Sequence, residues 1–232
     1  MVPKRGHLHE RRIVATTSGV SGDGRNMRAT RTHDAIAASM TQLIQEGHIE
    51  PTALEVAKRA NVSVRTIFVH FANMESLYAE IVRRQTLLVM PLLVVLDCRR
   101  ETDDKALELI AIRDAIYSRA APLRNSIRFG ATVRESETIR GGLQRLREAM
   151  AAQVQQSFRE ELLLQVEPHQ RASRIEAVTS FEMWDHLHRV QGIARGATRA
   201  QMLALLRAEL TTGVAALGSA IIPIDGLAAF GA

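Results

Sequence analysis

The chain has 232 residues, and its 30 Lys and Arg against 25 Asp and Glu give a formal net charge of +5. A hydrophobic content of 46% with 24% charged residues is typical of a globular fold. The single cysteine, Cys98, excludes an intrachain disulfide and a cysteine-based metal cluster, which suits a reducing cytoplasm.

The longest apolar run, Leu87–Leu96, is interrupted by Pro91. A helix that spans a bilayer needs about 20 apolar residues. No membrane association is therefore expected, and the predicted localisation is cytoplasmic.

The positive charge is concentrated at the N-terminus. Residues 1–31 contain seven basic and two acidic side chains, a net charge of +5, so the remainder of the chain is neutral overall. This segment is rich in Arg, Gly, Ser and Thr without an apolar period, which predicts a flexible, mostly disordered basic arm. The glycines of Gly19–Gly24 indicate a linker, because no strand precedes them and no phosphate-loop pattern matches.

The segment from 52 to 71 predicts two short helices joined by a tight turn. Thr52 and Glu55 form a T-x-x-E capping box at the start of the first helix. Asn61 stands where the turn needs a left-handed residue, and Ser63 is placed to cap the second helix. Two helices with this spacing form a helix-turn-helix.

The interior of this unit should be apolar. We expect inward-facing side chains at Leu54, Val56, Ile67 and Phe71. These side chains would hold the two helices at their crossing angle.

Residues from Thr32 to Leu77 resemble the DNA-binding domain of the tetracycline-repressor (TetR) family of transcriptional regulators. The matching positions are Gly47 after a first helix from Ile36 to Leu43, then Thr52, Val56 and Ala57, then Val62, Ser63, Thr66, Ile67, Phe68, His70 and Phe71, and finally Asn73, Glu75 and Leu77.

The resemblance implies an all-α protein in three parts. The basic arm at 1–31 precedes a helix-turn-helix DNA-binding domain at 32–77 and a helical ligand-binding and dimerisation domain at 78–232. Such a protein would bind a palindromic, double-stranded DNA operator as a homodimer. It would most often be a repressor that a small, mostly apolar effector releases from DNA.

The resemblance also suggests which residues touch DNA. Arg65 is the candidate sequence reader, because its guanidinium can bind O6 and N7 of guanine together, although a phosphate contact is a close alternative. The other candidates are Thr52, Ser63, Val64, Thr66, Phe68, Val69 and His70, with Arg28 and Arg31 of the arm.

Two departures leave an alternative open. Phe68 and Met74 stand where the family usually has Tyr and Lys, and neither can donate to phosphate. Residues 32–84 contain five basic and six acidic side chains, a net charge of −1. A helical protein-interaction module that kept the helix-turn-helix but lost DNA binding is the competing interpretation.

The rest of the chain predicts helices and no sheet. The first expected helix begins near Asn73 and ends at Pro91, and the second begins at Thr102 or Asp103 with a stripe of Leu107, Ile110 and Tyr117. Two further helices are expected over Ser136–Phe158 and Gln170–Val190. A last helix should follow a second capping box of Thr198 and Gln201.

The last two of these helices resemble the region through which many family members dimerise. The implied effector would bind among the middle helices. The candidate lining residues are Tyr117, Phe129, Met150, Phe158 and Trp184, although each is more often an ordinary core residue.

No cofactor, metal site or catalytic motif is predicted. Glu182 with His186 and Asp185 with His188 have helical spacing, but no third ligand is evident. Neither a nucleophile elbow nor a zinc-protease motif occurs, so an enzyme is not expected.

Overall fold

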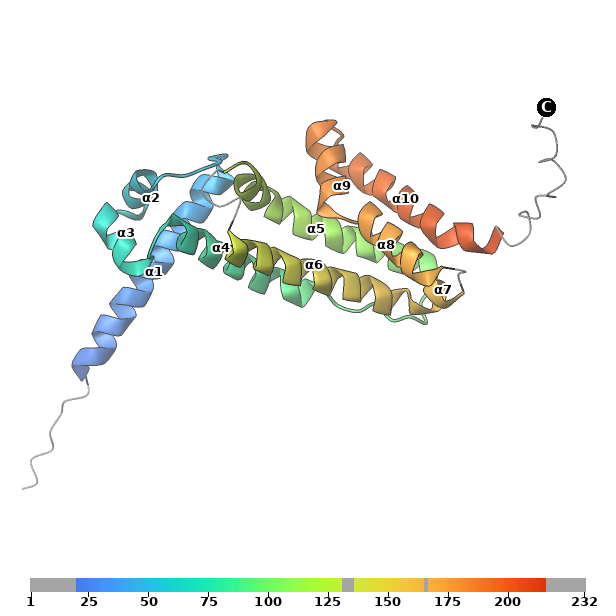
Figure 1. Ribbon diagram of the computed structural model, residues 1–232, viewed down its shortest axis with the longest axis horizontal. Coiled ribbons are helices and arrows are strands. Elements are labelled where there is room, and N and C mark those ends of the chain that lie inside the picture. The colour runs from blue at the N-terminus through green and yellow to red at the C-terminus, as the bar shows by residue number, and fades with distance from the viewer. Residues whose placement is uncertain (1–19, 131–135, 165–166, 216–232) are drawn as a thin grey trace, which may run out of the picture.

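The computed structural model describes residues 20–130, 136–164 and 167–215, and in these ranges the chain contains helices and no strand. The predicted all-α fold is confirmed. Figure 1 shows an elongated molecule in which α1, α2 and α3 form one end and the helices from α5 to α10 form the other.

The first group of helices comprises α1 (Val20–Gln45), α2 (Ala53–Ala60), α3 (Val64–His70), α4 (Met74–Val89) and the short 3-10 helix η1 (Met90–Leu92). The second comprises α5 (Thr102–Phe129), α6 (Glu137–Ser157), α7 (Arg159–Leu163), α8 (Pro168–Val178), α9 (Phe181–Asp185), the π-helical turn η2 (His186–Val190) and α10 (Arg195–Ala215).

The first helix begins much earlier than the sequence suggested. α1 starts at Val20, so the prediction of a disordered arm and glycine linker is wrong from that residue onward, while residues 1–19 lie outside the described ranges. The buried half of α1, where Ile36 and Met40 are fully enclosed, provides a stable helical segment from which the helix can extend toward the N-terminus. Each further residue then adds a hydrogen bond without a new nucleation cost, and the twelve residues before Thr32 extend the rod by about 18 Å.

Two hydrophobic cores form, one at each end of the molecule. The N-terminal core gathers residues such as Ile36, Val56, Ile67 and Leu77 from α1 to α4. It also receives Leu123 and Ile127 of α5 and Ile139 of α6. The two long helices of the second group therefore reach into the core of the first.

Polar contacts connect the same helices. The Tyr78 hydroxyl of α4 lies 3.1 Å from Ser126 Oγ of α5, and Ser126 donates to the carbonyl of Ile49 at 2.5 Å. Ser136, the N-cap of α6, donates to Glu75 Oε1 of α4 at 2.5 Å. α4 is therefore held by both α5 and α6.

α6 and α4 also pack unusually closely. A Cβ atom placed on Gly142 would lie 3.3 Å from Val82 Cγ1, which is tighter than an ordinary contact. The absence of a side chain at Gly142 thus allows the two helices to approach.

Two predicted helices differ from the structure. The expected helix over 170–190 is broken at Thr179 and Ser180, where the Ser180 hydroxyl accepts the N–H of Met183 and starts α9. The last helix begins at Arg195, and Thr198 is a buried helical residue whose hydroxyl donates to the Ile193 carbonyl at 3.2 Å. A new N-cap at Ser180 thus interrupts the first of these helices, and the Thr198 hydroxyl does not act as the predicted cap of the second.

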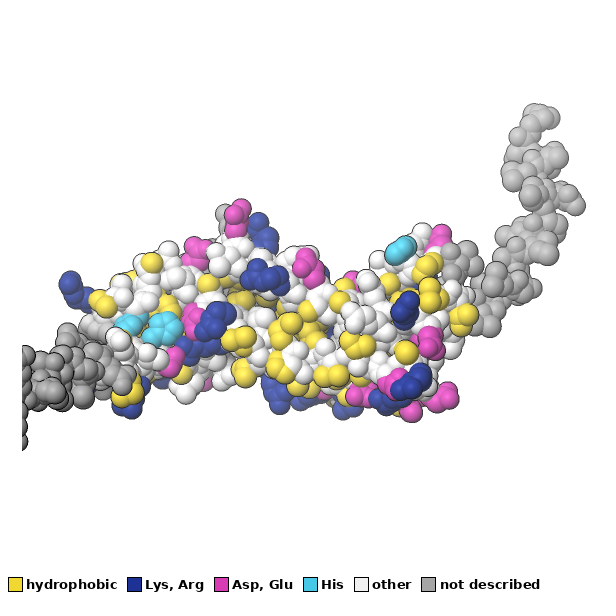
Figure 2. Space-filling model, turned by 90° about the horizontal axis from the view of Figure 1, so that it is seen from below, with side chains coloured by type: hydrophobic (Ala, Val, Ile, Leu, Met, Phe, Trp, Pro, Cys, Tyr) yellow, Lys and Arg dark blue, Asp and Glu magenta, His cyan; other side chains and the backbone are white. Residues whose placement is uncertain are grey.

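The predicted apolar stripe of α5 is only partly buried. Ile110 and Tyr117 are in the core, but Leu107 is 45% exposed. Figure 2 shows hydrophobic side chains gathered over the middle of the face seen from below. Exposed apolar side chains at the end of α4 and in the segment that follows it include Leu87, Leu88, Met90, Leu92, Val94 and Val95.

Candidate nucleic-acid interface and ligand cavity

The caps of α2 and α3 form as predicted. Thr52 Oγ1 accepts the N–H of Glu55 at 3.3 Å, and the Glu55 carboxylate accepts the N–H of Thr52 at 2.7 Å. The Thr52 hydrogen bonds hold the pKa of Glu55 below its ordinary value. Asn61 adopts the left-handed conformation, with φ of 53° and ψ of 46°, and the Ser63 hydroxyl accepts the N–H of Thr66 at 3.0 Å.

The interior of this unit is confirmed at three of its four predicted positions. Val56 and Ile67 are fully buried, and Phe71 is 4% exposed. Leu54 is 68% exposed, so its prediction is wrong. Leu54 lies about 200° around the helix from Val56, and α2 has one buried side only. Leu54 therefore faces away from the core.

One face of α3 is turned to solvent. Arg65, Phe68 and Val69 are exposed and share the i, i+3, i+4 spacing that puts residues on one helix face. Val64, Thr66 and His70 border this face and are partly exposed. The buried Ile67 lies on the opposite side and anchors α3 to the core. The helix is thus supported from behind and open in front, as insertion into a groove requires.

The hydroxyl groups of Thr52 and Ser63 are already engaged as caps. Both side chains are exposed at the start of their helices. Ser63 Oγ also lies 2.8 Å from Thr66 Oγ1. Each hydroxyl keeps hydrogen-bonding capacity toward an external group.

Many cations of the helix-turn-helix region are neutralised by carboxylates. Arg59 is paired with Glu46 at 2.5 Å. Arg84 contacts both Asp34 and Glu80 at 2.6 Å. These paired arginines are therefore less available to contact DNA phosphates.

A further pair completes this pattern. Arg83 lies 2.7 Å from Glu80, and the hydrogen bonds from Arg83 and then Arg84 lower the pKa of Glu80 to about 2. By contrast, Lys58 and Arg65 have no carboxylate within 4.0 Å among the described residues. They are the cations of α2 and α3 that remain available.

The extension of α1 carries two further basic residues. Arg28 and Arg31 are exposed and lie one helical turn apart. Figure 1 shows this part of α1 running past α3 and away from the body of the molecule. The sequence identified both residues but placed them in a disordered arm.

Sequence reasoning missed His33. Its ring stacks on Phe71 with centroids 4.5 Å apart, and it meets the edge of His70 at 6.3 Å. His33 thereby fixes the end of α3 against α1. The sequence signal that could have found it is its position three residues before Ile36, which places both side chains on the same face of a helix.

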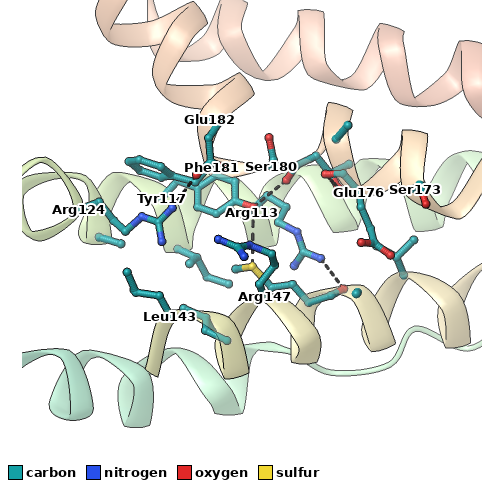
Figure 3. A pocket seen from close by; sticks show the side chains of 18 residues that line it. Arg113, Tyr117, Arg124, Leu143, Arg147, Ser173, Glu176, Ser180, Phe181 and Glu182 are labelled. Carbon is teal, nitrogen blue, oxygen red and sulfur yellow. Dashed lines mark hydrogen bonds and ion pairs between the residues drawn. The ribbon is translucent and has the colours of Figure 1, made fainter. Parts of the chain in front are cut away.

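A cavity of about 320 Å³ lies between α5, α6, α8 and α9 (Figure 3). Two predicted effector residues, Tyr117 and Met150, line it. Phe158 is buried in the core and does not line it, which corrects that prediction. Phe129 ends α5, and its side chain is outside the description.

Trp184 also does not line this cavity. It is 2% exposed, its ring lies 6.1 Å from that of Phe181, and its indole N–H donates to Asp114 Oδ1 at 3.1 Å. Phe181 itself does line the cavity. Trp184 thus borders a second hollow of about 610 Å³ that extends to His48 and Ile49 after α1.

The cavity wall combines apolar and charged groups. The Tyr117 hydroxyl donates to the Thr179 carbonyl at 2.7 Å, and burial raises the pKa of Tyr117 to about 12. Arg113, Arg124 and Arg147 also line the space. Figure 3 shows all three guanidinium groups directed into it. None of these arginines was identified from the sequence.

The acidic and histidine pairs near α9 are engaged in structural contacts. Asp185 binds Arg189 at 2.8 Å, and His188 Nδ1 lies 2.9 Å from the Ile193 carbonyl. No group of three potential ligands that could hold a metal occurs in the described part of the chain. The described helices also lack an apolar stretch long enough to cross a bilayer.

These features define a helix-turn-helix protein with an internal cavity in its second helical part. Residues 35–81 match the family model of bacterial regulatory proteins of the tetR family. Residues 35–81 thus form a DNA-binding domain of the TetR type, which indicates a DNA-binding transcriptional regulator. This result favours DNA binding over the interaction-module alternative.

A solved structure shares the overall fold. It is that of a candidate TetR-family transcriptional regulator from Mesorhizobium loti MAFF303099. The TM-score is 0.57 at 18% identity, over 80% of this chain and 98% of the other. The comparison with curated proteins finds no match.

Proposed function

We propose that the protein is a cytoplasmic, dimeric repressor that occupies a palindromic DNA operator until a small molecule binds its cavity. In this proposal residues 32–77 read DNA, and residues 78–232 bind the effector and the second subunit. The observation that carries the proposal is that α5 and α6 both line the cavity and hold α4.

DNA binding would use the outer face of α3. Arg65 is free of ion pairs among the described residues and points away from the core, so its fork is available to a base edge. Phe68 and Val69 would supply apolar contact to thymine methyl groups or sugars. Lys58, with Arg28 and Arg31 on the α1 extension, would contact phosphates and hold the protein in register.

Dimerisation would place two copies of α3 about one turn of DNA apart, as a palindromic site requires. α8 and α10 pack side by side on the opposite side of α5 from α4 (Figure 1). α10 keeps Leu205 exposed at 40% and presents small alanine side chains around it. Such a face suits close packing against the same helices of a second subunit.

Effector release would follow from the shared helices. A ligand that separates α5 from α6 would move Ser126 and Ser136, which hold α4 and the turn before α2. A coupling of about 1–3 kcal/mol would weaken operator binding roughly 5- to 150-fold. By reciprocity, operator DNA would weaken effector binding by the same factor.

The test is a fluorescence-anisotropy titration of the purified full chain with its own promoter fragment at two salt concentrations. We expect binding with a stoichiometry of two chains per site. In a plot of the logarithm of the affinity against the logarithm of the salt concentration, the slope should be about −0.9 for each phosphate contacted. A matched scrambled fragment is the control. No binding at low salt, or a single chain per site, would contradict the proposal.

A further inference from the structure

Arg113 is a buried cation without a carboxylate partner. The residue is 1% exposed and lines the cavity. Its guanidinium donates to Gln153 Oε1 at 2.7 Å and to the carbonyl of Met150 at 3.2 Å. Both acceptors are neutral, and no carboxylate lies within 4.0 Å of it in the described part of the chain.

Such an arrangement leaves hydrogen-bonding capacity unused and gives the charge no directly bonded anion. A guanidinium has five N–H donors, and the two bonds occupy only part of them. Burial lowers the pKa of Arg113, but an arginine still remains protonated at physiological pH. Buried charges are normally paired, so the geometry calls for an external anion.

A second cation faces the same space. Arg147 of α6 donates to the Gln144 side chain at 2.6 Å and has no carboxylate within 4.0 Å among the described residues. Figure 3 shows its guanidinium reaching up from α6 toward the ring of Tyr117. Arg124, the third arginine, is already paired with Glu182 at 2.7 Å and stacks on Phe181. Two of the three cations thus lack a carboxylate within ion-pair distance among the described residues.

The remaining wall is mostly apolar. Ile116, Leu143, Leu146 and Phe181 are among the residues that line the cavity. Glu176 lines it as well; burial lowers the pKa of Arg113, and the Glu176 carboxylate partly opposes this from beyond ion-pair distance. Glu176 would disfavour an anion placed beside it, so an anionic group must sit toward the arginines.

We infer that the effector carries a carboxylate-type anionic head on a compact apolar body, with the head bound by Arg113 and Arg147. The inference rests on the proposed function, because it specifies the chemistry of the ligand in the proposed effector cavity. The apolar body would lie against the leucines of α6 and the ring of Phe181. Charge-assisted hydrogen bonds to a guanidinium are about twice as strong as neutral ones.

The experiment compares three probes that differ only in the head group: octanoate, 1-octanol and octylammonium. Binding to the full-length protein is measured through the fluorescence of Trp184, the single tryptophan, which stacks on Phe181 in the cavity wall. Isothermal titration calorimetry provides an independent readout. We expect octanoate to bind about tenfold or more tightly than octanol, and octylammonium to bind weakest.

Variants of the lining residues test which side chains cause the preference for octanoate over octanol. Arg113→Met should reduce the ratio of octanoate to octanol affinity to less than about threefold, and Arg113→Lys should retain part of it. Arg147→Gln changes an exposed side chain, so it tests the head-group site even if Arg113→Met fails to fold. Glu176→Gln is the matched control of opposite sign and should strengthen octanoate binding.

The outcomes separate this inference from the proposed function. Octanol binding as tightly as octanoate, octylammonium binding most tightly, or no binding of octanoate at millimolar concentration would overturn the inference. Operator release by a neutral ligand would then leave the repressor proposal intact. Selective octanoate binding with unchanged operator affinity would instead support the inference and refute effector release.

Discussion

Arg65→Ala should reduce operator affinity and relax base preference at one position in each half-site. Arg65 is exposed on the outer face of α3 and has no carboxylate partner among the described residues. Losing one bidentate base contact costs about 1–3 kcal/mol, a factor of roughly 5 to 150 in affinity. Because the side chain supports no core contact, we expect the free energy of unfolding to change by less than about 0.5 kcal/mol.

The assay is competition anisotropy with the operator and a set of single-base variants. The wild-type protein should discriminate at one guanine, and Arg65→Ala should bind all bases at that position alike. Lys58→Ala is the matched control, since Lys58 is exposed on α2 and also lacks an ion pair in the described ranges. Lys58→Ala should weaken every sequence equally and reduce the salt slope by about 0.9. If Arg65→Ala gave this uniform result instead, Arg65 would be a phosphate contact and the base-reading argument would be refuted.

Three further predictions test the packing and electrostatics. Ile67→Ala empties a fully buried site behind α3, and it should lower the free energy of unfolding by about 2–5 kcal/mol in urea titrations; a loss below 1 kcal/mol would contradict this placement. Gly142→Leu should force α6 away from Val82, destabilise the fold by about 1–3 kcal/mol and change operator affinity; an unchanged melting temperature would exclude the close approach. Glu80 has a folded pKa of about 2 against an ordinary 4.5, so its stabilisation is present above pH 4.5 and is lost as the pH falls toward 2. Glu80→Gln should therefore be less stable than wild type by at most about 3 kcal/mol at neutral pH, with the difference vanishing near pH 2, and a constant difference would refute the ion-pair assignment.

Local sequence patterns predicted the helix-turn-helix well. The caps at Thr52 and Ser63 and the left-handed Asn61 depend on contacts within four residues, so their types and spacing suffice. The start of α4 at Asn73 follows the same logic. The residues that form each of these short-range interactions are neighbours in the sequence, so the sequence alone predicts them.

Long-range packing decided the features that were missed. The sequence does not show that α1 is anchored strongly enough to continue back to Val20. The break at Thr179 depends on the Tyr117 hydroxyl, which donates to the Thr179 carbonyl from α5, sixty-two residues away. Leu54 was assigned to the core by residue type, although its position around α2 turns it outward.

The cavity was predictable only in part. Tyr117 and Met150 were identified as bulky apolar candidates on middle helices, and both line it. Arg113 was missed because arginine is usually exposed, and its burial depends on Gln153 and the Met150 carbonyl of another helix. Charged residues enclosed by tertiary structure carry no periodic pattern.

The most direct test of the central claim, that α3 enters the DNA groove as half of a symmetric pair, is hydroxyl-radical footprinting on the promoter fragment at low salt. We predict two protected patches on one face of the duplex, related by a dyad and centred about one helical turn apart. A single patch, or uniform cleavage at saturating protein concentration, would contradict the account.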